Sequence, residues 1–518
     1  MVGRQWLSFG SAVLLAATVG CDSILGIGDH EYVKDASAGP MAAESSASPM
    51  CPPGCFSGTP TTDLQFFNQC TTATCVPYDN CQELNLCPDG GDASLPPLVP
   101  PDAATATSDA SPPSLPTVPC YDPTARPLLI FMQGSTNFTP FIEAMAPLVA
   151  PQGYVIVWQP TSSCAGAAAG GFDPTKSLMM NPTSSAQTPA SFYDGDGGAT
   201  PCLLGNSPSD PNGPDGGVET TDIGESDVFA NICPGSSATS PWVPGSTAYP
   251  SVSEARGPVQ AMVFVTPQGS TATAISAEAA YEVFGTGGNG GVSKPWTNPA
   301  DIFIRSSTTG TTNILSLAID VPPTQWWGTV EPNAPAMVKQ IVDTSVPLAP
   351  MTIGTLSTDY ADTNTTQKRS TPILYFQAKG QLAGFLPDST PGSFDKQNVR
   401  DGHYSPWGYI HLYSKLNSSG VLSPQASALI QQFNMPNTDL LNATINGAAV
   451  PTCAMHVQRT EEMGPLTTYN TKYPCNCFYD LTVNGGTTQC ATCKLPADCQ
   501  SSQVCNYGYC EDVSPEAN

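Results

Sequence analysis

The segment RPLLIFMQGSTNFTPFIEAMAPLVAPQGYVIVWQPTSS, residues 126–163, decides the fold class. Its first part contains the short apolar run LLIFMQG, which is typical of a buried strand. An amphipathic helix is expected over residues 137–153, where Pro and Gly close it, and YVIVWQP at 154–160 is typical of a second buried strand. Strand, helix and strand in this order predict an α/β sheet with parallel strands.

The same alternation continues to about residue 450. Further strands are expected at 259–267, 301–307, 351–361 and 372–378, and further helices at 276–285, 313–320, 334–344 and 423–435. Residues 166–219 are rich in Gly, Asp and Pro, so we expect a surface insertion there, which Cys164, Cys202 and Cys233 could staple.

The N-terminal sequence predicts export. Residues 1–20 contain one early arginine, an apolar stretch and small residues before Cys21, as in a bacterial lipoprotein signal peptide, although Thr18 stands where Leu is more usual. We therefore expect Cys21 to be lipidated and residues 21–50 to form a polar tether. The alternative is an ordinary signal peptide with an incidental cysteine. The expected location is the cell envelope, with the chain anchored to a membrane by lipid and facing the periplasm or the cell exterior.

The chain has 19 cysteines, and 18 remain for disulfides once Cys21 is set aside. They predict small disulfide-rich modules at 51–90 and 451–518. A Pro/Ala/Ser linker at 91–119 separates the first module from a main domain at 120–450. Zinc is the competing interpretation of the cysteines at 51–87, but no histidine accompanies them.

Charge and motif content exclude several classes of function. The net charge is −26, with only 17 basic residues and no basic cluster, so nucleic acid is an unsuitable partner. The Gly-rich loop at 285–294 has no Gly-Lys-Ser/Thr and fails the phosphate-loop pattern. The four histidines are scattered, with neither a nucleophile elbow nor metal-ligand spacing, so the sequence predicts neither an enzyme nor a metal or cofactor.

Four predicted strand ends carry small hydroxyl, glycine or acidic residues. They lie at 133–141, 158–166, 222–229 and 303–313. In α/β sheets ligands bind at the carboxyl ends of strands, where a helix that begins there points N–H groups at the ligand. A hydroxyl before a helix is ordinarily only an N-cap, but four such segments in one domain favour a ligand site.

These segments resemble the type 2 periplasmic binding proteins, most of all the phosphate-binding subunit of phosphate ABC transporters. The resemblance lies in Gly134-Ser135-Thr136, Ser162-Ser163, Gly224-Glu225-Ser226-Asp227, Lys294 to Pro299, and Arg305 with Thr309-Gly310-Thr311. It covers roughly residues 125–440. It implies two α/β lobes joined by crossing strands, the first at about 120–258 and 375–450 and the second at about 259–374.

The resemblance also implies the ligand site. Its oxyanion contacts would be Thr136, Asn137, Ser163, Asp227, Arg305, Thr309, Gly310 and Thr311. Asn137 stands where many relatives have Phe, and Thr309 replaces the usual Ser.

The chemistry of these residue types fits that role. Arg305 would supply a planar fork and the hydroxyls neutral donors, while Asp227 would repel an anion without protons, such as sulfate, and accept the proton of hydrogen phosphate. The resemblance thus implies a solute-binding protein that takes up phosphate with an ABC permease.

Several alternatives remain open from the sequence. Sulfate, molybdate or an organic phosphate could replace phosphate. Arg305 and Asp227 could form a plain buried ion pair. The chain could be a surface adhesion or structural lipoprotein that retains the binding fold without transport, or, as the sparse histidines disfavour, a hydrolase.

Overall fold

The computed structural model of the chain describes residues 51–84, 95–101, 115–122, 128–182, 188–205, 219–288, 293–363, 368–434 and 436–513. The predicted signal peptide, Cys21 and the tether lie outside these ranges, as do parts of the predicted linker. Within the described ranges, no helix combines the length and the apolar character that crossing a membrane requires.

The larger sheet has eight strands in the order β13-β9-β18-β8-β2-β3-β5-β6. The strand β2 lies parallel to both β3 and β8, and β18 lies antiparallel to β8 and β9. The bounds are β2 Leu128–Gly134, β3 Tyr154–Pro160, β5 Ser191–Tyr193, β6 Ala199–Pro201, β8 Ile223–Ser226, β9 Val252–Val265, β13 Gly354–Ser357 and β18 Trp407–Lys415. The parallel pair β2 and β3 is the pair that the opening segment predicts.

Three helices, α3, α10 and α11, share one hydrophobic core with the first-lobe strands of this sheet. They are α3 Thr139–Val149, α10 Pro424–Asn434 and α11 Thr438–Asn446. Their buried faces meet Ile130, Met132 and Trp158 from the strands, and Phe138 and Phe141 stack with ring centroids 5.4 Å apart. This core fixes the ends of β2 and β3, and therefore the loops that follow them.

The second lobe is built on a four-stranded sheet in the order β1-β17-β16-β10. Its strands are β1 Cys75–Val76, β10 Ala274–Ser276, β16 Tyr375–Gln377 and β17 Gly384–Phe385, with a separate pair β11 Phe303–Ile304 and β12 Thr329–Val330. Its helices are α5 Ala277–Thr286, α6 Gly310–Ile319, α7 Ala334–Val342 and α9 Gln397–Arg400. Because β16 and β17 share this sheet with β10, the second lobe continues beyond residue 374.

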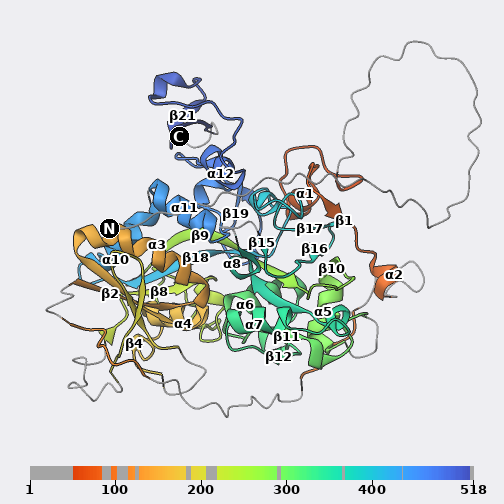
Figure 1. Ribbon diagram of the computed structural model, residues 1–518, viewed down its shortest axis with the longest axis horizontal. Coiled ribbons are helices and arrows are strands. Elements are labelled where there is room, and N and C mark those ends of the chain that lie inside the picture. The colour runs from red at the N-terminus through yellow and green to blue at the C-terminus, as the bar shows by residue number, and fades with distance from the viewer. Residues whose placement is uncertain are drawn as a thin grey trace, which may run out of the picture. The chain divides into compact units, whose positions relative to one another are not determined.

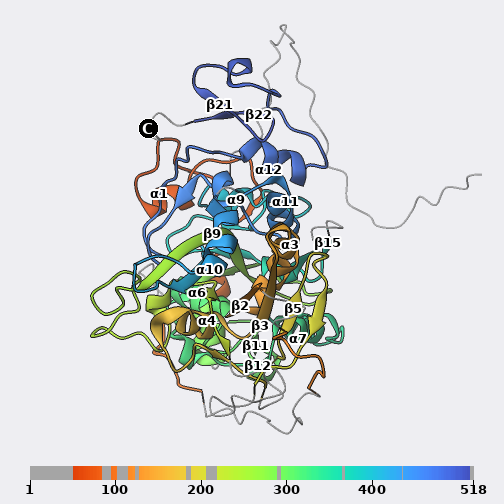
Figure 2. The same cartoon turned by 90° about the vertical axis from the view of Figure 1, so that its left-hand side faces the viewer.

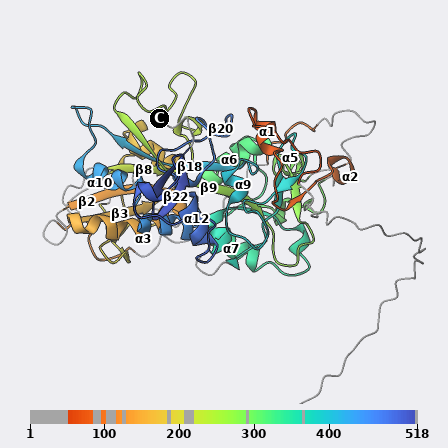
Figure 3. The same cartoon turned by 90° about the horizontal axis from the view of Figure 1, so that it is seen from above.

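Two long strands, β9 and β18, connect the lobes. The first part of β9 pairs with β18 in the first lobe, and its last part, Met262–Val265, pairs with β13 in the second. Figure 3 shows the α3, β2 and β3 region on one side of β9 and β18, and the α5, α6 and α7 region on the other. The predicted two-lobed α/β fold with crossing strands is confirmed by this topology (Figure 1).

Two sequence predictions differ from the structure. The expected strand at 351–361 ends at Ser357 and turns into the short helix α8 Thr358–Ala361. The expected insertion at 166–219 is partly internal, because α4 Ser163–Ala167 and the helical turn η3 Ala168–Phe172 are buried against β8 and β18. Small residues permit this packing, since a Cβ at Gly166 would overlap the backbone of Glu225.

The strands β5 and β6 from the same stretch extend the sheet, and β4 Leu178–Met179 pairs with β7 Glu219–Thr220.

Both cysteine-rich ends are held by disulfides, and every cysteine among the described residues is disulfide-bonded. The printed pairs are 51–75, 55–70, 120–202, 164–233, 453–475, 477–490, 493–505 and 499–510. A cysteine in a disulfide has no thiolate that could bind a metal, so these paired cysteines are not zinc ligands.

The two ends attach to the main domain in different ways. The N-terminal module contains α1 Asp63–Phe67 and α2 Asn80–Leu84, and its strand β1 is part of the second-lobe sheet. The C-terminal segment contains β19 Val457–Gln458, β20 Thr467–Thr468, α12 Asn476–Val483, β21 Gln503–Asn506 and β22 Tyr509–Asp512. Figure 2 shows α12, β21 and β22 on the α11 side of the first lobe. Through β1, the N-terminal module is therefore an integral part of the second lobe.

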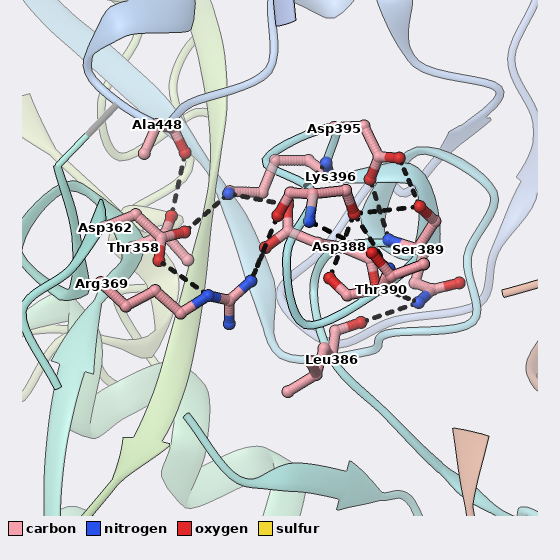
Figure 4. A network of polar contacts seen from close by, with 12 residues as sticks. Thr358, Asp362, Arg369, Leu386, Asp388, Ser389, Thr390, Asp395, Lys396 and Ala448 are labelled. Atoms are coloured by element: carbon pink, nitrogen blue, oxygen red, sulfur yellow. Dashed lines mark hydrogen bonds and ion pairs between the residues drawn. The ribbon is translucent and has the colours of Figure 1, made fainter. Parts of the chain in front are cut away.

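A buried network of two carboxylates and two cations stabilises the second lobe (Figure 4). Asp362 and Arg369 come from the hairpin β14 Asp362–Thr363 and β15 Lys368–Arg369, and Asp388 and Lys396 from the loop before α9. The Lys396 ammonium lies 2.8 Å from Asp362 and 2.9 Å from Asp388, and Arg369 lies 2.7 Å from Asp388. The four charges balance, so the network has no need of a ligand.

Replacing Lys396 should therefore destabilise the fold. Lys396→Met leaves two buried carboxylates with a single cation, and we expect the free energy of unfolding to fall by about 3–5 kcal/mol in urea titrations. Lys379→Met is the matched control, because its side chain is 73% exposed and its pairing with Asp320 is a surface contact. A loss below about 1 kcal/mol for Lys396→Met would contradict the structural role of the network.

Candidate functional site

A small cavity lies where strand ends of the two lobes meet. The first lobe contributes residues after β2 and β3, and the second contributes β13 and the starts of α6 and α7. The lining residues are Ser135, Thr136, Asn137, Thr161, Ser162, Arg305, Thr309, Thr311, Ala334, Thr355, Leu356 and Ser357. The free volume is about 10 Å³, so the site suits a small inorganic group in this closed arrangement.

Arg305 is the only charged residue in this lining, and its side chain is 6% exposed. Among the described residues no carboxylate lies within ion-pair distance of its guanidinium, and Nη1 is buried without a hydrogen-bond partner. Burial lowers the pKa of Arg305 to about 10, so the group is still charged at pH 7. The plain Arg305–Asp227 ion pair, left open by the sequence, is not formed in this arrangement.

The start of α6 supplies neutral donors beside Arg305. Thr309 is the N-cap, and its hydroxyl contacts Thr312. The first N–H groups of a helix have no partner within the helix, and the positive end of the helix dipole lies there. Thr309 and Thr311 both line the cavity, so hydroxyl groups of this turn lie beside Arg305, although the Thr309 hydroxyl also donates to the Ser306 carbonyl at 2.9 Å.

Three of the eight predicted site residues lie directly behind the cavity lining. The Gly310 N–H donates to Ser163 Oγ at 2.8 Å, and Ser163 Oγ donates to Asp227 Oδ2 at 2.9 Å. Asn137, which lines the cavity, donates from Nδ2 to the same oxygen at 3.2 Å. The structure thus brings all eight predicted residues together, five in the lining and three in the layer that orients it.

Glycine is required at position 310 by this close approach. A Cβ there would lie 2.5 Å from the Asp227 Cβ and 2.8 Å from Ser163 Oγ, distances that packed atoms do not tolerate. The first turn of α6 can reach the first lobe only because the side chain is missing.

The sequence predictions missed acidic and phenolic groups near the site. After β13, the carboxyl oxygens of Asp359 are buried although the residue is partly exposed, and this burial together with the charge of Asp227 raises its pKa to about 8. Tyr360 donates from its hydroxyl to the Thr136 carbonyl at 3.4 Å. Ser357-Thr358-Asp359-Tyr360 is a hydroxyl- and acid-bearing strand end like the four that were identified, so the same criterion could have found it.

The described histidines lie elsewhere. His411 bonds Glu254 at 2.5 Å, His456 bonds Asp401 at 2.6 Å, and His403 bonds the Gln69 carbonyl at 3.0 Å. A larger cavity of about 330 Å³ lies between α11 and the C-terminal segment, and its lining has no charged side chain. The site beside Arg305 is therefore the one whose chemistry points to a charged ligand.

Comparison with solved structures finds phosphate-binding proteins of ABC transporters. A phosphate ABC transporter substrate-binding protein from Clostridium perfringens, described with bound phosphate, is 11% identical with a TM-score of 0.40, over 62% of this chain and 99% of that one. An ABC-type phosphate transport receptor from Vibrio cholerae is 12% identical, with a TM-score of 0.36 and coverage of 62% and 99%. A phosphate-binding protein from Stenotrophomonas maltophilia is 11% identical, with a TM-score of 0.35 and coverage of 65% and 91%.

No protein-family model matches the sequence, and no curated protein matches it either. At these identities the similarity to solved structures concerns the fold.

The contact between α6 and Asp227 gives a direct test of the closed site. Gly310→Ala should lower the free energy of unfolding by about 1–3 kcal/mol, because the new methyl group overlaps Asp227 and Ser163. Gly392→Ala is the control, since a Cβ there meets no atom within 4 Å, and it should change stability by less than about 0.5 kcal/mol. Equal stabilities of the two variants in denaturant titrations would mean that the lobes do not meet as described.

Proposed function

We propose that this chain is a solute-binding protein whose two lobes close on a small inorganic oxyanion, with phosphate as the ligand. The observation that carries the proposal is the buried Arg305 guanidinium, which has no ionic partner among the described residues and lines a cavity of hydroxyl groups. A buried charge without a partner is strongly unfavourable, and an anion in the cavity would compensate it.

The donor set is sufficient for useful affinity. Hydrogen bonds to a charged group contribute about 1.5–3 kcal/mol each, so four or five exceed the roughly 8 kcal/mol of a micromolar complex. Arg305, Thr309 and Thr311 would bind from the second lobe, and Thr136 and Asn137 from the first. The small free volume favours an inorganic ion over an organic phosphate.

Contacts between the lobes couple ligand binding to closure. The Cys164 N–H donates to the Thr308 carbonyl at 3.2 Å, and the Gly310 N–H donates to Ser163 Oγ. An anion that bridges Arg305 and the loop after β2 would favour the state in which these bonds form. Such a change of state is what a membrane permease could recognise.

Export and anchoring complete the proposal. Cys21 would carry the lipid, residues 21–50 would be the tether, and an ABC permease would be the partner that receives the ion. The disulfide bonding of all described cysteines suits an oxidising compartment. The N-terminal module does not favour the alternative of an adhesion protein, because its strand β1 is part of the second-lobe sheet.

Arg305→Met separates ligand binding from folding. We expect phosphate affinity, measured by calorimetry at pH 7, to fall at least about 100-fold, equivalent to about 2.7 kcal/mol. The ligand-free variant should be as stable as the wild type or more so, because a buried unpaired charge is removed. Lys339→Met, which removes a cation whose side chain is 77% exposed, should bind phosphate like the wild type. Unchanged affinity in Arg305→Met would refute the proposed site.

Asp227→Asn tests the choice between oxyanions. Its carboxylate lies behind the lining and accepts from Asn137 and Ser163, so it selects against an anion without a proton only if the proton of hydrogen phosphate replaces one of these donors on binding. The variant should bind sulfate at least about tenfold more tightly than the wild type, a change of about 1.4 kcal/mol. Competition of sulfate against phosphate gives the ratio, and an unchanged ratio would remove Asp227 from ligand selection.

A further inference from the structure

Glu225 and Asp227 form a buried acidic pair beneath the proposed oxyanion site. They stand two residues apart at the end of β8, so their side chains share one face of the strand. Glu225 is 0% exposed and Asp227 is 1% exposed. The Glu225 carboxyl fills the space above Gly134, where a Cβ would come within 2.5 Å of Oε2.

Two of the four carboxyl oxygens have conventional donors. Glu225 Oε2 accepts from the Ser135 N–H at 2.6 Å, and Asp227 Oδ2 accepts from Ser163 and Asn137. The other two oxygens, Glu225 Oε1 and Asp227 Oδ1, are buried and accept no N–H or hydroxyl hydrogen from the described residues.

Each of the two carboxyl groups acts on the pKa of the other, and each has one buried oxygen without a donor. Two ionised carboxylates would repel each other and leave both oxygens unsatisfied, whereas one shared proton would remove both penalties. One proton on Glu225 Oε1 satisfies all four oxygens, because Oε2 then acts as the carbonyl acceptor and Asp227 Oδ1 receives the donated bond.

The surroundings decide which residue holds the proton. Burial and the neighbouring charge of Asp227 raise the pKa of Glu225 well above its usual range. Burial also raises the pKa of Asp227, but the hydrogen bonds that its Oδ2 accepts from Ser163 and Asn137 oppose that rise. Asp227 accepts from two side-chain donors and Glu225 from one backbone N–H, so the negative charge is better stabilised on Asp227.

We propose that Glu225 is a positioning residue of the anion site, whose carboxylic acid donates a hydrogen bond to Asp227 and keeps the pair at one negative charge. The part of this inference that concerns ligand selection rests on the proposed oxyanion function. An anion in the cavity makes ionisation of Glu225 still less favourable, so alkaline pH should couple anion binding to proton uptake by the pair.

Other titratable groups also face the pair. Asp359 of α8 adds negative charge when it ionises, and Glu462, from the segment after β19, lies within electrostatic range of Asp227. Arg305 of the second lobe and His411 of β18 act on Asp227 from further elements. Because Asp359 could take up a proton too, Asp359→Asn is a necessary parallel variant.

Glu225→Gln and Glu225→Met together test the hydrogen bond. The Gln amide can donate to Asp227 while its oxygen accepts from Ser135, so phosphate affinity at pH 7 should stay within about threefold of wild type. Met cannot donate, so the variant should bind phosphate at least about tenfold more weakly, with altered phosphate-to-sulfate selectivity. Equal affinities of the Gln and Met variants would overturn the positioning role.

Proton uptake is measured by phosphate calorimetry between pH 8.5 and 10 in two buffers of different ionisation enthalpy. Phosphate itself changes protonation little there, so uptake reports the protein. Arg305, whose pKa is about 10, would also take up a proton, so the difference between the wild type and Glu225→Gln is the quantity that reports the acid pair. The wild type and Asp359→Asn should take up protons on binding, and Glu225→Gln should take up fewer than either. The same uptake in Glu225→Gln as in the wild type would contradict the proposal.

A measurement without ligand distinguishes this inference from the proposed function. A protonated buried carboxyl gives an infrared C=O stretching band at pH 7, and we expect Glu225→Gln to lose a band that Asp359→Asn retains.

The free energy of unfolding of the wild type should also fall relative to Glu225→Gln as pH rises from about 4.5 through the folded pKa of Glu225. If phosphate does not bind but this band is lost, the proposed function fails and the acid pair stands. If Glu225→Gln keeps every protonated-carboxyl band of the wild type, the protonated acid pair is refuted, whether or not phosphate binds.

Discussion

The guanidinium of Arg305 is the constraint around which the site is organised. It is held away from water with no carboxylate at ion-pair distance among the described residues, while neutral hydroxyls from both lobes surround it. A protein that needed only stability would place an apolar side chain or an ion pair here, as the balanced network around Lys396 does within the second lobe. The contrast between these two buried cations is the physical argument for an anionic ligand.

Close approach of backbones makes this arrangement possible. Side chains are absent where helices meet strand ends, at Gly134 beneath Glu225, at Gly166 beside β8 and at Gly310 against Asp227. These contacts bring helix starts and strand ends of both lobes to one point, and β9 and β18 carry the chain between the lobes. The contact between the lobes, the placement of the cavity lining and the burial of Glu225 and Asp227 therefore depend on these three glycines.

The sequence predicted the parts of this structure that depend on local pattern. The apolar run of β2, the amphipathic helix α3 and the second run of β3 predicted the parallel strand pair. The hydroxyl-rich strand ends predicted residues that line one cavity in the structure. Pairs of strands that lie far apart in the sequence could not be predicted from local pattern. Nothing local indicates that β1 joins β17, or that small residues after Ser163 fold into a buried helix. The position of Asp227 behind the lining, and its burial together with Glu225, depend on side-chain packing that no spacing rule encodes.

The most direct test of the central claim is an anomalous diffraction measurement on crystals grown with arsenate, a tetrahedral analogue of phosphate whose arsenic atom can be located unambiguously. We expect one strong arsenic peak between the loop after β2 and the start of α6, with arsenate oxygens within hydrogen-bond distance of the Arg305 guanidinium. Crystals with saturating arsenate and no peak beside Arg305, or a peak only at another surface, would contradict it.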